Sequence, residues 1–203
     1  DRLQSLMDDY TTAGTVGPIR VALSEKVYRY LLDRPPLAAT LIHRLGLGLY
    51  SSEFRGPGRF WGDDGEGTKG IVELVYEDAM SRIYFLEGTH KSRLLPHIAG
   101  KAVVFLRMDV VREKDSREMI DSTLVVYTKL DNRFLSGLAS LLRPLVGRIT
   151  GGKLRKGVQT VNRLGMAMRQ SPEGVLARAV EPPSLSDADL AFLRETLGSL
   201  PAP

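Results

Sequence analysis

The 203-residue chain contains no cysteine, and this absence removes several kinds of chemistry. Disulfides, thiolate metal sites and a cysteine nucleophile are all excluded. Long apolar runs are also missing, because no stretch approaches the roughly 20 residues that a membrane-spanning helix needs. No Ser-His-Asp order, P-loop or dinucleotide-binding glycine pattern occurs. The hydrophobic fraction of 43% and the charged fraction of 26% are typical of an ordinary globular domain.

Acidic residues are missing from residues 132–170, which carry eight basic residues and therefore a net charge of +8. The tail 171–203 holds two basic and five acidic residues, so the total of +4 leaves −1 for residues 1–131. One interpretation is a solvated helix face that strand acids balance; the candidates are Asp109, Glu118 and Asp121. The alternative is contact with an anionic surface, where each basic group contributes roughly 1 kcal/mol near acidic lipid. Nucleic acid is not expected, because no reader motif is present.

The same stretch predicts a long amphipathic helix over residues 130–170. Apolar residues recur at steps of three and four; they are Phe134, Leu138, Leu141, Leu145, Ile149, Leu154, Val158, Val161, Leu164 and Met168. Asp131 and Asn132 are candidate N-caps. Pro144 and the pair Gly151-Gly152 weaken a helix locally. The pattern predicts one bent helix or two nearly in line, with a kink or a helix break within a turn of Gly151 and Pro144 as the other candidate position.

The residues before this helix predict one strand, two short helices and then a run of antiparallel strands. The first strand is Val16–Leu23, and Pro35-Pro36 separates helices at Ser24–Asp33 and Leu37–Leu45. Six further strands follow: Leu49–Arg55, Arg59–Trp61, Lys69–Glu77, Arg82–His90, Lys101–Arg112 and Glu118–Lys129. In the fifth of these, alternation predicts that the apolar residues at even positions point inward; they are Ala102, Val104, Leu106, Met108 and Val110. Residues 1–14 form a loose or briefly helical arm, and Ser186–Leu197 forms a last helix.

This order predicts an α+β fold in which the long helix covers the apolar face of the sheet and leaves room for a cavity. It resembles the START-like helix-grip superfamily, which includes polyketide cyclases and lipid-transfer domains. The resemblance rests on the Ser24–Tyr28 start of the paired short helices, the strand meander and the Leu130–Phe134 start of the final helix. It covers residues 16–170 of a single domain 1–203, with 171–203 as a C-terminal extension. It implies a curved antiparallel sheet of six to seven strands around the long helix.

The resemblance also implies binding or transport of a lipid-like or polycyclic molecule. An enzyme of the cyclase, dehydratase or aromatase type is the alternative, with Glu87 or His90 as general base. A partner-binding domain with a filled core is a third hypothesis. No complete set of catalytic groups is visible, so a binding protein ranks above an enzyme, and no cofactor is expected.

Six residues are candidates for the ligand cavity: Trp61, Tyr76, Tyr84, Glu87, His90 and Tyr127. The aromatics suit an amphipathic wall, and they equally suit core or sheet-surface positions. A four-residue turn after Glu77 places Glu87 among apolar side chains, where it must be paired or protonated. A register change of one residue moves it to solvent. His90 is a candidate cavity residue, whereas His43 and His97 suit structural roles.

Lys153, Arg155 and Lys156 are the candidates for contact with an acidic membrane. No metal site is expected, because the cluster Asp63-Asp64-Gly65-Glu66 lacks the spacing of a calcium loop and suits a turn. The sequence leaves compartment and oligomeric state open. A cytoplasmic protein is slightly favoured, and an exported mature form fits a chain that starts at Asp1 rather than Met.

Overall fold

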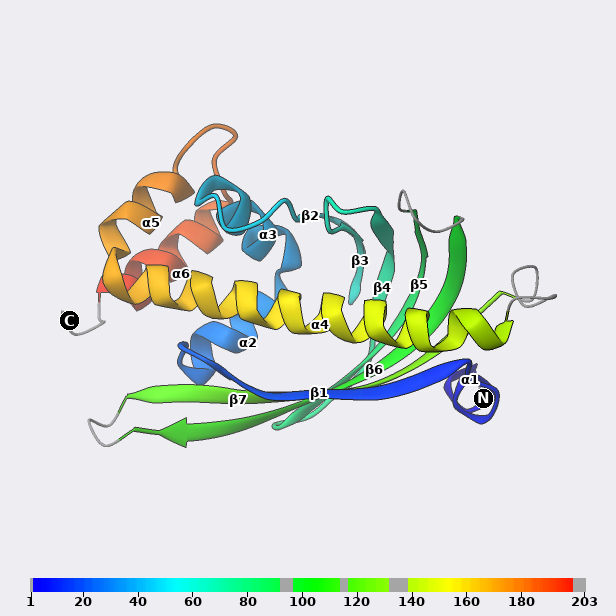
Figure 1. Cartoon of the computed structure of the whole chain (residues 1–203). Coiled ribbons are helices and arrows are strands. Elements are labelled where there is room, and N and C mark those ends of the chain that lie inside the picture. The colour runs from blue at the N-terminus through cyan, green and yellow to red at the C-terminus, as the bar shows by residue number, and fades with distance from the viewer. Residues whose placement is uncertain (1, 92–96, 114–116, 132–138, 199–203) are drawn as a thin grey trace.

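A seven-stranded antiparallel sheet and six helices form the part of the chain that the computed structural model describes, residues 2–91, 97–113, 117–131 and 139–198 (Figure 1). The strands are β1 (Thr12–Val21), β2 (Ser51–Gly56), β3 (Arg59–Asp63), β4 (Thr68–Glu77), β5 (Ser81–His90), β6 (Ile98–Arg112) and β7 (Glu118–Leu130). The helices are α1 (Arg2–Asp8), α2 (Glu25–Asp33), α3 (Pro35–Arg44), α4 (Ala139–Gln170), α5 (Pro172–Ala179) and α6 (Asp187–Gly198). The α+β class and the long helix are as predicted.

The strand order is β1-β7-β6-β5-β4-β3-β2, with every neighbouring pair antiparallel. Strands β2 to β7 therefore form a meander, and β1 closes the far edge beside β7. Figure 1 shows that β3, β4 and β5 curve up beside α4, which lies across one face of the sheet. We call this face inner and the opposite face outer.

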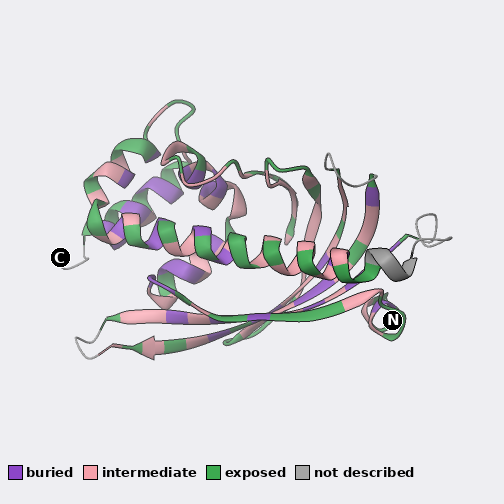
Figure 2. Ribbon diagram, in the orientation of Figure 1, coloured by how far each residue is buried: buried purple, intermediate pink, exposed green. Residues whose placement is uncertain are grey.

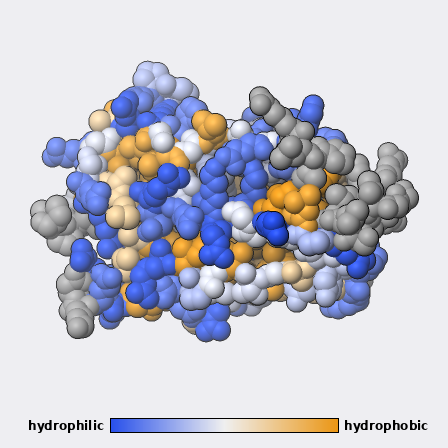
Figure 3. Space-filling view, viewed as in Figure 1, coloured by the Kyte–Doolittle hydropathy of each residue, from blue (hydrophilic) through white to orange (hydrophobic). Residues whose placement is uncertain are grey.

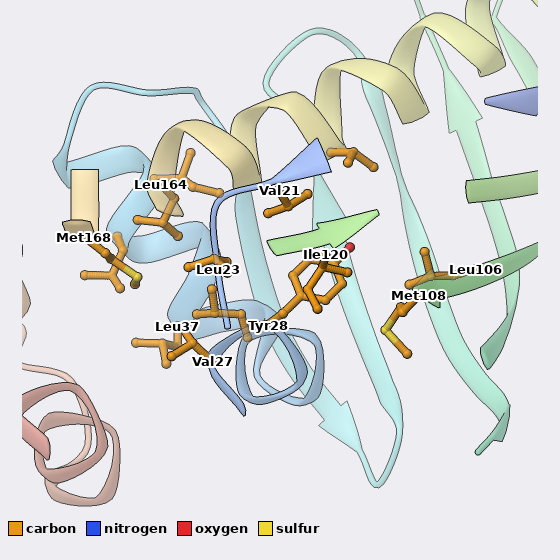
Figure 4. Close-up of a cluster of buried hydrophobic side chains, with 14 of the residues drawn as sticks. Val21, Leu23, Val27, Tyr28, Leu37, Leu106, Met108, Ile120, Leu164 and Met168 are labelled. Carbon is orange, nitrogen blue, oxygen red and sulfur yellow. The ribbon is translucent and has the colours of Figure 1, made fainter. Parts of the chain in front are cut away.

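The inner face carries the main hydrophobic core. Leu106 and Met108 of β6 belong to one buried cluster with Leu164 and Met168 of α4, and in the view of Figure 4 Val21, Tyr28 and Ile120 lie between the two pairs. The inward direction predicted for alternate residues of β6 is thus correct for Val104, Leu106 and Met108, which are buried. Val110 lies on the same face, opposite the buried Ile120, but it is itself 43% exposed.

Helix α1 covers part of the outer face. Its Leu6 is buried against Phe85 and Val103, which point away from α4. The Arg2 guanidinium lies 3.9 Å from the centre of the Phe85 ring and 3.1 Å from Glu73. The N-terminal arm is therefore briefly helical, and a single buried leucine anchors it to the sheet.

Helix α4 runs without interruption through Gly151-Gly152, so the predicted break there is wrong. Pro144 lies inside the helix as well, near its described start. The reason is tertiary packing: a Cβ at Gly147 would lie 2.8 Å from the Thr12 hydroxyl oxygen, and one at Gly151 would lie 3.8 Å from Val16. Gly147 lets α4 approach β1 closely, and the packing of α4 on β1 stabilises the helix. The predicted helix start at residues 132–134 lies outside the described residues.

The C-terminal helices share the core of the rest of the chain. Val175 and Ala179 of α5 and Leu190 and Leu193 of α6 are buried in the same cluster as α2 and α3. Helix α6 confirms the predicted last helix, whereas α5 was not predicted separately. Figure 2 shows buried residues concentrated in this helical end, while α4 keeps exposed residues along its outer side. Among the described residues, no helix is both long and apolar enough to cross a membrane.

Candidate functional site

A cavity of about 520 Å³ lies between residues 146–161 of α4 and the inner face of strands β3 to β6. Helix α4 lines it with Val146, Ile149, Thr150, Lys153, Leu154, Gly157 and Val161. Further apolar lining comes from Ala39, Ile42, Val72, Leu86, Ile98 and Leu130. Figure 3 shows hydrophobic residues exposed among hydrophilic ones on the face where α4 passes the curved strands β3 to β5. A pocket of roughly 300–1,000 Å³ with mostly apolar walls is typical of small-molecule sites.

Four glycines form the floor of this cavity. Gly62, Gly70, Gly88 and Gly100 pair directly across β3, β4, β5 and β6, and all four line the cavity. Gly88 lies between Leu86 and His90 in the alternation of β5, so the row belongs to the inner face. Four positions where side chains would project toward α4 therefore project none, which leaves the space empty.

The same row lets neighbouring strands approach closely. A Cβ at Gly70 would lie 2.3 Å from the Glu87 carbonyl oxygen, and one at Gly88 would lie 2.5 Å from the Lys69 carbonyl oxygen. Glycine inside a strand often marks such a close backbone approach. A Cβ at Gly62, by contrast, would meet nothing nearer than 4.0 Å. The row thus removes side-chain volume from the cavity and permits a close approach of β4 and β5.

A polar pair lies in the wall at the ends of β4 and β5. The Nδ1 atom of His90 and the hydroxyl oxygen of Thr68 are 2.9 Å apart, on directly paired residues. Burial lowers the pKa of His90, the positive charge of Lys153 lowers it further, and Asp64 opposes these effects in part. His90 is therefore neutral near pH 7.

Ion pairs connect α4 to the turn between β3 and β4. The Lys153 ammonium lies 2.6 Å from Asp64 and 3.1 Å from Glu66, and Lys156 also pairs with Glu66. The Asp64 carboxylate accepts hydrogen bonds from the backbone N–H groups of Glu66 and Thr68, at 2.7 and 3.0 Å. Burial alone would raise the pKa of Asp64, but the hydrogen bonds from Lys153 and from these amides outweigh it and lower the pKa. The turn and the helix are thus tied together beside the cavity.

The shape of this turn depends on Gly67. Its φ of +93° is a conformation that other residues rarely adopt, and a Cβ there would lie 2.0 Å from the Lys91 carbonyl oxygen. The interpretation of Asp63–Glu66 as a turn rather than a calcium loop agrees with these contacts. Among the residues that the structure describes, no group of three or more His, Asp or Glu side chains is placed to hold a metal ion.

Two of the predicted cavity residues face the interior. His90 lines the cavity, as described above. Tyr84 also points to the inner face, opposite Val104, but it packs against the filled core and burial raises its pKa. Tyr84 is therefore a core residue rather than part of the cavity wall.

The other aromatic candidates do not wall the cavity, so that prediction is wrong for Trp61, Tyr76 and Tyr127. Tyr127 lies opposite Val103 on the outer face, and its ring packs edge-on against Tyr10 at 5.4 Å. Trp61 lies opposite Ile71, one position away from the inner pair of Gly62 and Gly70. Tyr76 follows an irregularity in the β4–β5 pairing, is 50% exposed, and donates a hydrogen bond to Asp78 at 2.9 Å.

The Glu87 side chain points to solvent, which confirms the second of the two predicted alternatives. It borders the cavity through its place in β5, but it pairs with Ile71 and Lys101, whose alternation belongs to the outer face. Its side chain is 62% exposed, with one carboxylate oxygen 3.7 Å from the Lys101 ammonium. The predicted four-residue turn is present, with Glu77 opposite Arg82, but the irregularity between Leu74 and Tyr76 shifts the pairing so that Leu86, not Glu87, is opposite Val72.

The three basic candidates are not a free cluster. Lys153 lines the cavity and, like Lys156, is paired with acids, while Arg155 is exposed and forms no ion pair with a described residue. The acids expected to balance them are paired elsewhere: Asp109 with Arg107, Glu118 with Arg112 and Asp121 with Arg20. The balancing acids come instead from the β3–β4 turn.

Sequence reasoning missed the glycine row and the role of that turn. A signal for the row was present, because Gly62, Gly70, Gly88 and Gly100 interrupt otherwise regular strand patterns. Their alignment, however, depends on the register of three strand pairs. The turn offered no comparable signal, since Asp64 and Lys153 are far apart in the chain.

Comparisons with known proteins bear on the fold alone. No family model matches the chain, and no curated protein matches it. Among solved structures, a conserved protein from Geobacillus kaustophilus is similar, with 12% sequence identity and a TM-score of 0.52. The match covers 76% of this chain and 93% of the other. At this identity the likeness supports a shared architecture.

Proposed function

We propose that the chain is a START-like helix-grip protein that binds a hydrophobic small molecule, lipid-like or polycyclic, in the cavity beneath α4. One observation carries the proposal: an apolar cavity of about 520 Å³ over a floor of four aligned glycines. Closing such a space with side chains would bury more apolar surface and stabilise the fold by about 25 cal/mol per Å². A chain that forgoes this stabilisation at four paired positions is consistent with selection for the empty volume.

Binding is favoured over catalysis by the surroundings of the two candidate bases. The enzyme hypothesis needs Glu87 and His90 to reach one cavity, and the Glu87 carboxylate lies on the outer face. His90 has a hydroxyl partner in Thr68, and no carboxylate among the described residues accepts a hydrogen bond from its ring. A partner-binding domain with a filled core predicts no cavity. An acidic membrane is not part of the proposal, because Lys153 and Lys156 are already neutralised by Asp64 and Glu66.

A matched pair of glycine substitutions tests the site. Gly157 lines the cavity and Gly152 is exposed, and a Cβ at either position would meet nothing within 4 Å. Both lie in α4, so replacing either by leucine raises helix propensity by a similar amount, up to about 1 kcal/mol. Only the substitution at Gly157 places a large side chain in the cavity.

The protein and its Gly157→Leu and Gly152→Leu variants would be purified from the source organism and studied by native mass spectrometry, followed by extraction of bound molecules. Binding of the neutral fluorescent dye Nile red would be measured in parallel. We expect wild type and Gly152→Leu to retain a hydrophobic ligand and to bind the dye, and Gly157→Leu to lose both by about tenfold or more. Equal binding by all three proteins, or none by wild type, would refute the proposal.

A further inference from the structure

We propose that the ligand carries an uncharged hydrogen-bonding group, a hydroxyl above all, and that His90 binds it. This inference rests on the proposed function and specifies its ligand: an apolar body with one neutral polar head. It follows from the charges and hydrogen bonds of the polar part of the wall, where His90, Thr68 and Lys153 meet the apolar lining.

The charges beside the cavity cancel. Lys153 and Lys156 supply two positive charges, and Asp64 and Glu66 supply two negative ones, all within one set of ion pairs. An anionic head placed next to Lys153 would also meet Asp64, which lies 2.6 Å from the same ammonium. A cationic head would meet Lys153 itself. A charged group buried without a partner of its own is costly, so the site favours an uncharged head.

His90 supplies the hydrogen-bonding atom. Its Nδ1 is committed to the Thr68 hydroxyl, and its Nε2 has no hydrogen-bond partner among the described residues. The Thr68 hydroxyl can either donate or accept, so the neutral imidazole can present Nε2 as an acceptor or as a donor. A ligand hydroxyl fits both cases because it also donates and accepts. A carbonyl fits only the tautomer in which Nε2 donates.

A series of ligands with one chain length and different heads tests the inference on the unmodified protein. 1-Decanol, decanoate and decylammonium would compete with Nile red near neutral pH, each below the concentration at which it self-associates. We expect 1-decanol to displace the dye about tenfold more effectively than either ion. Equal displacement by all three, or stronger displacement by an ion, would overturn the neutral-head inference and leave the proposed cavity function standing. Failure of wild type to bind the dye would overturn both.

Two substitutions test the named residues. Replacing His90 by Phe keeps a ring but removes its nitrogens. We therefore expect the variant to lose the preference for 1-decanol over decane, which has the same chain and no polar head. His90→Gln retains hydrogen-bonding groups and should preserve part of that preference. If His90→Phe kept the same preference for 1-decanol, His90 would not be the residue that binds the polar head.

The charge balance is tested by Glu66→Gln, which removes one negative charge from a partly exposed side chain. The remaining groups then carry a net positive charge, so decanoate should gain severalfold relative to 1-decanol, most clearly at low salt. The Nile red affinity, which involves no charged head, serves as the control for an intact cavity. An unchanged ratio of decanoate to 1-decanol would show that the ion pairs do not select the head, and would overturn that step.

Discussion

The two halves of α4 cross the same face of the same sheet, yet one half covers a filled core and the other covers a cavity. In the C-terminal half, Val158, Leu164 and Met168 are buried among side chains from β6, β7 and α2. In the first half, Val146, Ile149 and Leu154 line empty space. Both halves present apolar residues of similar size to the sheet, so the helix does not account for the difference.

The sheet accounts for it. Beneath the filled half lie Leu106, Met108, Ile120 and Leu124, which are large and buried. Beneath the hollow half lie the four paired glycines and Ala102. Interiors are normally packed to crystal-like density, so an open region needs positions that supply no volume. The apolar face of one helix can therefore cover either a filled core or a cavity, depending on the size of the strand residues opposite it.

The largest expected effect contrasts one leucine from each half. Leu164 is fully buried, at 0% exposure, and its replacement by alanine should lower the free energy of unfolding by about 2–5 kcal/mol. Leu154 lines the cavity and already lacks neighbours on one side, so Leu154→Ala should cost less than half as much. Guanidinium denaturation of both variants measures the difference. Equal losses would mean that the two halves are packed alike in solution.

A second comparison concerns the glycine row. Gly70→Ala forces a Cβ to within 2.5 Å of two backbone atoms of β5, and should cost about 1–3 kcal/mol. Gly62→Ala adds the same methyl group where nothing lies closer than 4.0 Å, and should change stability by at most about 0.5 kcal/mol. Thermal unfolding of the pair provides the measurement. Comparable destabilisation at both positions would contradict the close strand approach at Gly70.

The ion pairs beside the cavity should have a smaller effect, which neighbouring residues of α4 can isolate. Lys156→Gln removes a partner of Glu66, whereas Arg155→Gln removes an exposed charge that has no described ion-pair partner. We expect Lys156→Gln to lower the free energy of unfolding by about 0.2–1 kcal/mol at low salt, and Arg155→Gln to leave it nearly unchanged. In about 1 M salt, where the Debye length is about 3 Å, the difference should shrink. A difference that does not depend on salt would point to packing rather than charge.

The smallest expected effect is the titration of His90. Its pKa is lowered from 6.5, so its proton NMR resonances should titrate with a midpoint below that value. The unfolded chain takes up this proton at a higher pH than the folded one. His90 therefore reduces stability as the pH falls from the unfolded pKa through the lower folded pKa. His90→Gln should remove this contribution to the pH dependence of the free energy of unfolding. A titration midpoint of His90 at or above 6.5 would contradict the burial of its ring.

Local patterns were sufficient to predict the order of strands and helices apart from α5. Alternation along β6 identified its inner residues, and steps of three and four identified α4, because both periods follow from the geometry of a single element. In the same way, Pro35-Pro36 predicted the boundary between α2 and α3, and the spacing of apolar residues predicted α6. His90 was also identified as a cavity residue from its own strand. These features need no information about which strand lies beside which.

The cavity floor, the direction of Glu87 and the partners of Lys153 and Lys156 depend on contacts between distant parts of the chain. An irregularity between Leu74 and Tyr76 sets the β4–β5 register, and one residue of register exchanges the inner and outer faces. That register aligns Gly70 with Gly88 and turns Glu87 to solvent. The acids that neutralise Lys153 are about 90 positions earlier in the chain and are brought near it by the folding of the sheet. Periodicity describes one element at a time, so it carries no information on such alignments.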